Sequence, residues 1–398
     1  QEHEPDFDSG RIDEIEIQEI RKEDIINHLN NHFTKVMPPR HPVLVARIEN
    51  GKAKFFHKSF INVIKRAGSR PIIFCAGCGR FQQGKTFIIS GLTGNWGHKI
   101  GNGFGEQTKG VYIDGPYSID YFYERFNISG RESIYYQNNK LLTPLVFFFD
   151  IEGYGFYNDG NSYEEYIKMS MPFLCLSSVF LFLSDKNPGV NEIQKYIEQI
   201  KISNLTTHSN DSNSNGSLKL LVVLNNYYPK IANMDDDIKK LQSDCNKEWN
   251  GSILLSKYGI KYEFQPIYAY NPCYEKKMFC DSFQRFATVL IRSIENATEG
   301  NFIRCGNHSI KLFNYIIQHN NQPLFDQRIK KIIKDYHENS FETIAYNALQ
   351  QSHKVISIKI KNITNDLYKD LSKSCNFAEF SDNIVKISEN EINKYLFS

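Results

Sequence analysis

The chain has 398 residues, of which 41% are hydrophobic and 14% aromatic, so it can bury a sizeable core in one large domain plus a smaller one, or in two. Its 47 basic and 45 acidic residues give a formal charge of +2, and this balance excludes a general electrostatic attraction to nucleic acid. No run approaches the roughly 20 apolar residues that cross a bilayer. The eight cysteines are scattered over a chain too long to need disulfide staples. We therefore expect a cytoplasmic protein whose membrane contact, if any, is peripheral and comes from a region outside this chain or from a partner.

The N-terminal part predicts a tail followed by a hairpin. Residues 1–40 are expected to form an acidic tail, because the first 24 residues are rich in Asp and Glu and such runs are usually solvated. The stretch "HPVLVARIENGKAKFF" then predicts two strands joined at Asn50 and Gly51, a dipeptide that supplies two positive φ angles. A helix is expected over residues 61–67.

Apolar runs without alternation dominate the centre of the chain and predict a parallel sheet. Strands buried on both faces have this pattern, and here it occurs at residues 71–77, 145–150, 177–184, 218–226 and 263–270. Segments with room for helices separate the runs. The predicted fold is an α/β domain over residues 41–300, with a doubly wound, mostly parallel sheet. Beyond residue 301 apolar residues recur at spacings of three and four, which predicts a helical module over residues 301–398.

The stretch "GRFQQGKTF" carries the strongest chemical signal. It contains Gly-x-x-x-x-Gly-Lys-Thr, the complete phosphate-loop pattern, between a predicted buried strand and a plausible helix. Glycines let successive backbone N–H groups turn inward on an anion, and the helix N-terminus adds its positive end. Lys85 is expected to reach the β- and γ-phosphates, and Thr86 to offer its hydroxyl to Mg²⁺. We assign the whole loop to nucleotide binding: Gly79, Arg80, Phe81, Gln82, Gln83, Gly84, Lys85, Thr86 and Phe87.

Two further elements follow in the order that a nucleotide site requires. Asp150 ends a predicted buried strand, where its carboxylate is either a Mg²⁺ ligand or a plain strand-end cap, and the N–H of Gly153 would sense the γ-phosphate. Between the loop and this strand lies the glycine-rich segment 94–110. Its Thr108 either completes the Mg²⁺ shell or is an ordinary loop residue. A glycine-rich segment at this place is able to order on a triphosphate and relax on hydrolysis.

Three other candidates have less specific surroundings. Glu152 is either a solvated turn carboxylate or part of a hydrogen-bond chain that positions the attacking water. His98 is expected to be a mobile surface residue rather than a base. Cys75 and Cys78 have the spacing of a metal or redox motif, but they lack a second such pair and lie in an apolar run, so we expect a structural role.

Together these motifs resemble those of the guanylate-binding protein and atlastin branch of the dynamin-like large GTPases. The resemblance rests on "GRFQQGKTF", "TKG" at 108–110, "DIEG" at 150–153, the hairpin "PVLVARIENGKAKF" and the later "GNFIRCGNHSIKLFNYIIQHNNQP", and it spans about residues 41–325. It implies binding of GTP and GDP with Mg²⁺, nucleotide-dependent pairing of two copies through their GTPase domains, and remodelling of membranes or assembly on them. The helical remainder would be the middle domain.

The chain departs from this family in the phosphate loop. The family usually has an arginine at the position of Gln82, and such an arginine is worth about 10³ to 10⁵ in rate because it neutralises charge on the transferring phosphoryl group. Gln82 is able to orient a water or contact a phosphate but cannot supply that charge. Arg80, two residues earlier, is an alternative source of it.

A second departure concerns the base. The family reads guanine with an Arg-Asp pair at the end of a core strand, and here Asn225 and Asn226 align with that place. An amide oxygen accepts a hydrogen bond from guanine but lacks the charge and the two-oxygen geometry of a carboxylate.

The sequence thus predicts a large GTPase that hydrolyses GTP by direct attack of water on the γ-phosphate. Mg²⁺ would be held by Thr86, Thr108 and Asp150, and the catalytic candidates are Lys85, Thr108, Gln82 and Glu152. Two alternatives stay open. One is a nucleotide-binding switch or scaffold with little or no hydrolysis, and the other is an NTPase with relaxed base specificity.

Overall fold

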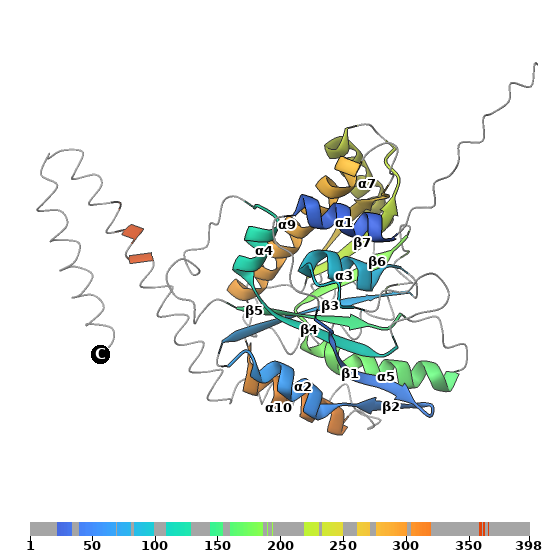
Figure 1. Cartoon of the computed structure of the whole chain (residues 1–398), viewed down its shortest axis with the longest axis vertical. Coiled ribbons are helices and arrows are strands. Elements are labelled where there is room, and N and C mark those ends of the chain that lie inside the picture. The colour runs from blue at the N-terminus through green and yellow to red at the C-terminus, as the bar shows by residue number, and fades with distance from the viewer. Residues whose placement is uncertain are drawn as a thin grey trace, which may run out of the picture.

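A computed structural model shows a mixed α/β fold (Figure 1). It describes residues 22–33, 40–68, 70–80, 83–98, 109–128, 144–153, 160–185, 219–230, 233–249, 261–270, 276–300 and 304–319, and a few isolated positions elsewhere. Within these ranges, no helix is both long and apolar enough to cross a membrane.

The described residues form a nine-stranded sheet whose main path has the order β2-β1-β4-β5-β3-β6-β7-β8. Five strands form its parallel part: β5 (Leu145–Ile151), β3 (Pro71–Gly79), β6 (Val179–Ser184), β7 (Lys219–Tyr227) and β8 (Lys261–Tyr268). Three antiparallel strands extend it: β4 (Val111–Ser118), β1 (Val43–Glu49) and β2 (Lys52–Phe55). The short β9 (Arg304–Cys305) pairs with the start of β3. The prediction of a mostly parallel sheet is confirmed.

The five apolar runs form the five parallel strands, because each strand is covered on both faces. β3, β5 and β6 are buried along their whole length. The predicted hairpin is also confirmed, with Asn50 at φ 51° and Gly51 at φ 71° between β1 and β2. β4 was not predicted, since its run "VYIDGPYS" contains Gly115 and Pro116, a pair that usually indicates a turn.

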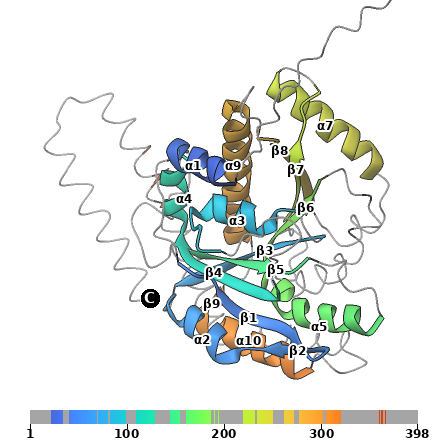
Figure 2. The ribbon, with the colours of Figure 1, turned by 45° about the vertical axis from the view of Figure 1, so that its right-hand side comes forward.

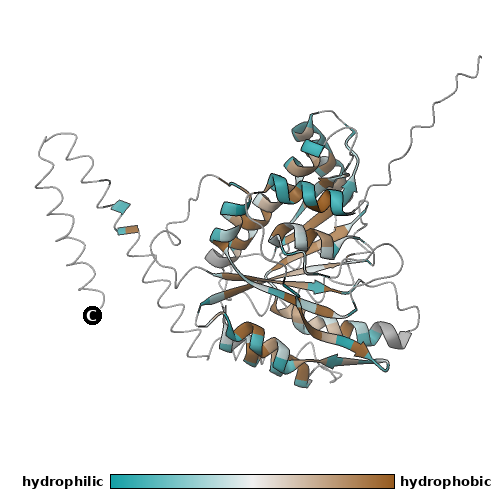
Figure 3. Cartoon of the chain, viewed as in Figure 1, coloured by the Kyte–Doolittle hydropathy of each residue, from teal (hydrophilic) through white to brown (hydrophobic). Residues whose placement is uncertain are grey.

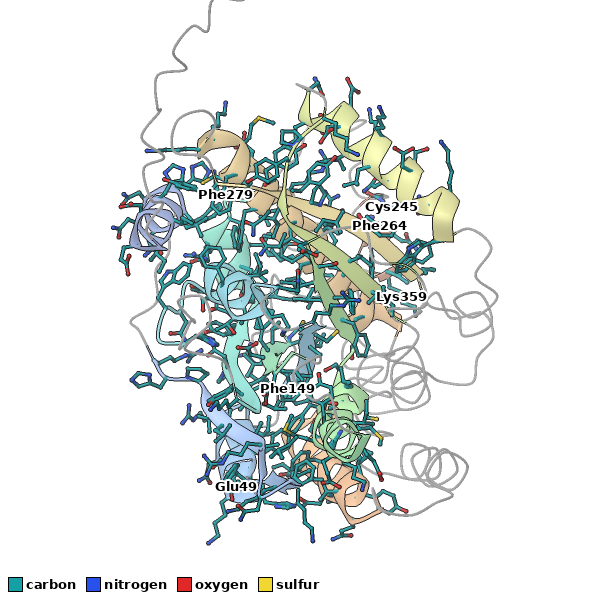
Figure 4. The ribbon with its side chains drawn as sticks, turned by 90° about the vertical axis from the view of Figure 1, so that its right-hand side faces the viewer. Glu49, Phe149, Cys245, Phe264, Phe279 and Lys359 are labelled. Carbon is teal, nitrogen blue, oxygen red and sulfur yellow. The ribbon has the colours of Figure 1, made fainter. Side chains whose placement is uncertain are left out.

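Helices cover both faces of the sheet, as a doubly wound fold requires (Figure 2). One face packs against α1 (Lys22–His32), α3 (Lys85–Thr93), α4 (Ile119–Arg125) and α9 (Lys276–Gly300). The other packs against α2 (His57–Lys65), α5 (Gly160–Leu176), α7 (Met234–Trp249) and α10 (Gly306–His319). Figure 3 shows the apolar residues concentrated in the strands and on the helix faces that cover them. Figure 4 labels three residues of the apolar layer that contains α5 and α7: Phe149 of β5, Cys245 of α7 and Phe264 of β8.

The alternation of β3 separates its two cysteines. Cys75 lies in the apolar layer with α3 and α9, whereas Cys78 lies in the opposite layer with α2 and α5. Both thiols are free and buried, and burial raises the pKa of Cys78 to about 12 and also raises that of Cys75. Two side chains on opposite faces of one strand cannot share a metal or form a disulfide with each other, so their placement supports a structural role.

Elements near both predicted domain boundaries pack on the α/β core. Within the predicted tail, Leu29 of α1 and Phe33, which follows the helix, are buried, and the Phe33 ring lies 4.8 Å from that of Phe126 in an edge contact. Beyond residue 300, β9 extends the sheet, and α10 stacks Phe313 on Phe60 of α2 at 4.0 Å between ring centroids. The boundaries at 40 and 300 stay predictions, but residues 22–33 and 304–319 contribute to this core.

The burial of α1 predicts that it stabilises the domain. Replacing Leu29 by Ala removes a fully buried side chain and should lower the free energy of unfolding by about 2 to 5 kcal/mol. Asn31→Ala, at an exposed position of the same helix, should change it by less than about 0.5 kcal/mol. Urea denaturation measures both, and equal midpoints for the two variants would contradict the packing of α1.

Candidate functional site

The carboxyl ends of the parallel strands bring the predicted site residues to one edge of the sheet. Gly79 ends β3, and Asp150 lies at the end of β5 beside Gly77 of β3. On the other side β6 pairs with β3 through Leu183 and Gly79, and β7 then pairs with β6 up to Leu224. This edge is where ligands bind in open α/β sheets.

The backbone of the loop requires its two glycines. Gly79 has φ 129°, and a Cβ there would overlap the carbonyl oxygen of Leu183. Gly84 has φ 77°, and a Cβ there would overlap the side-chain amide of Asn225. Helix α3 starts at Lys85, immediately after Gly84. The backbone N–H groups of its first turn have no partner within the helix, which makes its N-terminus suited to bind an anion.

Lys85 lies buried at the start of this helix. Its Nζ donates to the carbonyl oxygen of Arg80 at 2.8 Å and to that of Gly79 at 3.5 Å. Burial lowers the pKa of Lys85 to about 8, and the opposing charges of Asp150 and Glu152 limit the shift. The ammonium is thus held on the loop, with two carboxylates nearby.

Thr86 and Asp150 meet beside the loop. The Thr86 hydroxyl donates to Oδ2 of Asp150 at 2.7 Å, and Asp150 is buried. A hydroxyl at the start of a helix and a carboxylate at the end of a strand are oxygen donors of the kind that Mg²⁺ takes in proteins, so these residues fit that ion. Of the other assigned residues, Phe81, Gln82 and Thr108 lie outside the described part of the chain.

Two further loop residues, Arg80 and Phe87, lie in the described part of the chain. The side chain of Arg80 is exposed. The Phe87 ring packs against Trp96, with ring centroids 5.7 Å apart. The backbone of Arg80 contributes the carbonyl that holds Lys85, whereas Phe87 is positioned by its packing on Trp96.

Glu152 is not a solvated turn residue. It is 7% exposed, and its Oε2 accepts from the N–H of Gly110 at 2.6 Å. Its own N–H donates to the carbonyl of Gly110 at 2.9 Å, and the Tyr166 hydroxyl donates to its carbonyl at 2.8 Å. Glu152 therefore fixes the residue two positions after Thr108 to the strand end that carries Asp150 and the neighbouring, buried Gly153.

The expectation for His98 is wrong, because this histidine is buried. Its Nε2 lies 2.9 Å from Oδ2 of Asp114 on β4, which also accepts from Asn95 at 3.1 Å and from Tyr117 at 2.7 Å. Arg40 pairs with Oδ1 of Asp114 at 3.4 Å. Although burial opposes its ionisation, the contacts with His98, Tyr117 and Arg40 hold the pKa of Asp114 below its usual value. This cluster fixes residues 95–98 to β4.

Asn225 joins the end of β7 to the phosphate loop. Its Nδ2 donates to the carbonyl of Gln83 at 3.2 Å, and its Oδ1 accepts from the N–H of Asn226 at 3.1 Å. The structure thus places both asparagines at the end of β7, on the same edge of the sheet as the loop. The side chain of Asn225 is engaged with the loop, while Asn226 is exposed with φ 57°.

Comparisons with known proteins identify no family. No protein-family model matches the chain, and no curated protein matches it. Among solved structures, the chain is similar to the Arl6 (BBS3) small GTPase from Trypanosoma brucei with the bound nucleotide analogue GppNp. The match has 11% sequence identity and a TM-score of 0.27, and it covers 57% of this chain and 99% of that one. A likeness at this level carries no argument about function. The α/β assignment rests on the sheet order and on the strand, loop and helix described above.

The contact between Glu152 and Gly110 predicts a graded effect on stability. Glu152→Ala leaves a buried N–H without its acceptor and should lower the free energy of unfolding by about 2 to 3 kcal/mol. Glu152→Gln keeps an acceptor but loses the charge, so about 1 kcal/mol is expected. Glu164→Gln, at an exposed position of α5, serves as the control. Chemical denaturation measures the free energy of unfolding of the three variants. A value for Glu152→Ala equal to that of the control would contradict the role of Glu152 in holding Gly110.

Proposed function

We propose that the chain binds a Mg²⁺-bound nucleoside triphosphate at the carboxyl edge of its sheet and hydrolyses it. The observation that carries this proposal is the placement of buried Lys85 in a loop between β3 and α3, with Thr86 and Asp150 in contact beside it. GTP is the substrate that the family resemblance implies.

The loop supplies the groups that hold the phosphates. The N–H groups at the start of α3 and the ammonium of Lys85 are the donors, and Asn225 holds the loop carbonyl of Gln83 in place from β7. Phosphate oxygens carry charge and accept more strongly than the two carbonyls that Lys85 contacts. Lys85 is therefore expected to turn from these carbonyls to the β- and γ-phosphates.

Thr86 and Asp150 would hold the metal, and Thr108 is the third ligand that the sequence predicts. When bound there, Mg²⁺ neutralises charge on the β- and γ-phosphate oxygens. The chain's own contribution is to bring together the hydroxyl at the start of α3 and the carboxylate at the end of β5, where Gly110 is fixed through Glu152.

Hydrolysis is proposed as direct attack of a water oxygen on the γ-phosphorus. The bond from that phosphorus to the bridging oxygen breaks, which gives a nucleoside diphosphate and inorganic phosphate. Gln82 would orient the water, and Glu152 would act by fixing Gly110 near it. Since Gln82 brings no charge to the transferring group, turnover is expected to be slower than in the GTPases that the sequence resembles.

Three further parts of the proposal rest on the family resemblance alone. They are nucleotide-dependent pairing of two copies, peripheral membrane association through a region outside this chain or a partner, and a cytoplasmic location. The alternative of a switch or scaffold with little hydrolysis is favoured by one specific observation, the presence of Gln82 where the family has arginine.

Phosphate release from GTP tests the enzyme proposal. Wild-type protein with Mg²⁺ should release phosphate slowly, and Lys85→Ala should reduce the rate about 10²-fold, because it removes a donor that stabilises the developing charge. Lys65→Ala, an exposed lysine of α2, should leave the rate unchanged. If wild-type release does not exceed that of Lys85→Ala, the chain is not a hydrolase.

The residue at position 82 gives a sharper test of the missing charge. Gln82→Arg should raise the turnover number, by up to about 10³-fold if the arginine reaches the transferring phosphoryl group. Gln83→Arg adds the same charge one residue later and should give no such gain. Single-turnover phosphate release measures both, and equal rates for the two variants would mean that the loop does not use a charge at position 82.

A further inference from the structure

The end of β7 lies where the base of a nucleotide on the phosphate loop would lie. In the sheet β7 is two strands from β3, with β6 between them, so a strand spacing of about 4.8 Å separates them by roughly 10 Å. Thr86 and Asp150 lie on the opposite side, toward β5, which assigns the metal and the terminal phosphate to that side. A nucleotide lying along this edge therefore extends its base toward β7.

Asn225 is held by the loop. Both halves of its amide are bonded, Nδ2 to the carbonyl of Gln83 and Oδ1 to the N–H of Asn226. Asn225 is thus a positioning residue that holds the end of β7 against the loop.

Asn226 and Tyr228 are both exposed at this strand end. The pairing of β7 with β8 shifts register between Leu224 and Tyr227, and such a bulge redirects a side chain. Asn226, within it, is exposed with φ 57°, and the hydrogen bond that ties it to Asn225 uses its backbone N–H and leaves its side-chain amide out. Tyr227 packs against Tyr268 at 5.6 Å between ring centroids, whereas Tyr228, the next residue, is 73% exposed.

An asparagine amide pairs equally well with the two purines. Its NH₂ donates and its oxygen accepts, so it forms two hydrogen bonds with O6 and N1–H of guanine. After a 180° rotation it forms two hydrogen bonds with the amino group and N1 of adenine. A carboxylate only accepts: it pairs with N1–H and the 2-amino group of guanine and faces the lone pair of N1 in adenine unfavourably. An exposed aromatic ring adds stacking that tolerates any base.

We propose that Asn226 reads the base through its amide and that Tyr228 stacks on it, so that the site takes guanine and adenine triphosphates with similar affinity. This inference rests on the proposed function and specifies its substrate class as purine nucleoside triphosphates. In this arrangement Asn226 makes no hydrogen bond with the 2-amino group of guanine.

Equilibrium binding of non-hydrolysable analogues of GTP, ITP and ATP, with Mg²⁺, tests the inference on the full chain. Wild-type affinities should agree within about 5-fold. Asn226→Asp should favour the guanine over the adenine analogue by at least about 10-fold, with the inosine analogue between them because it lacks the 2-amino group. Asn127→Asp is the matched control, since Asn127 is also exposed with a positive φ, 47°, but lies at the end of α4.

Tyr228 is tested in the same assay. Tyr228→Ala should weaken all three analogues by about 10-fold, and Tyr228→Phe should preserve binding, because stacking needs the ring and not the hydroxyl. Equal binding by Tyr228→Ala and wild type would overturn the stacking role.

Inorganic tripolyphosphate separates failure of this inference from failure of the proposed function. Binding of tripolyphosphate that Lys85→Ala abolishes, together with a wild-type preference for guanine above about 100-fold, would overturn the base inference alone. The base inference alone is also overturned if Asn226→Asp leaves the ratio of guanine to adenine analogue affinity unchanged, as is expected of Asn127→Asp. If tripolyphosphate and all three analogues fail to bind, the proposed function falls and the base inference with it.

Discussion

The burial of the Lys85 charge is the constraint on which the candidate site depends. An ammonium removed from water needs hydrogen-bond acceptors and opposite charge. The loop provides the first through the carbonyls of Arg80 and Gly79, and Asp150 and Glu152 provide the second. Both carboxylates are themselves held, Asp150 by Thr86 and Glu152 by Gly110. The same groups that make the buried lysine tolerable therefore preorganise the place where a phosphate and a metal would bind.

The two flanks of the glycine-rich segment are held by separate contacts to the sheet. On one side, residues 95–98 are fixed to β4 by the buried Asp114 and its partners His98 and Asn95. On the other side, Gly110 is fixed by Glu152, at the point where β4 and β5 pair through Val111 and Ile151. Helix α1 adds a third contact, because Asn30 accepts from the Trp96 indole at 2.8 Å. The described ends of this segment are thereby joined to β4, to β5, which carries Asp150, and to an N-terminal helix.

The sequence predicted the strands and the loop, which local patterns of residues determine. It missed the features that depend on contacts between residues far apart in the chain. Unbroken apolar runs identified the five parallel strands, and the loop pattern placed Lys85 and Thr86 between a buried strand and a helix, where the structure has them. His98 was misjudged because its burial depends on Asp114, which lies in a strand hidden by a Gly-Pro pair. The alignment placed Asn225 and Asn226 at a strand end, and the structure has them at the end of β7. It could not show that one amide is bonded to the loop while the other is exposed, since a bulge in β7 decides this.

The two departures from the GTPases that the sequence resembles are of one kind. At position 82 an amide stands where that family has a positive charge, and at position 226 an amide stands where it has a negative one. Lys85, Thr86 and Asp150, which would hold the phosphates and the metal, are all present and in contact with their neighbours. Only interactions that strengthen in the transition state raise the turnover number. Under the proposed function, a chain that keeps these residues and lacks the charge at position 82 is expected to bind its nucleotide and to hydrolyse it slowly, which favours a timed switch over a fast hydrolase.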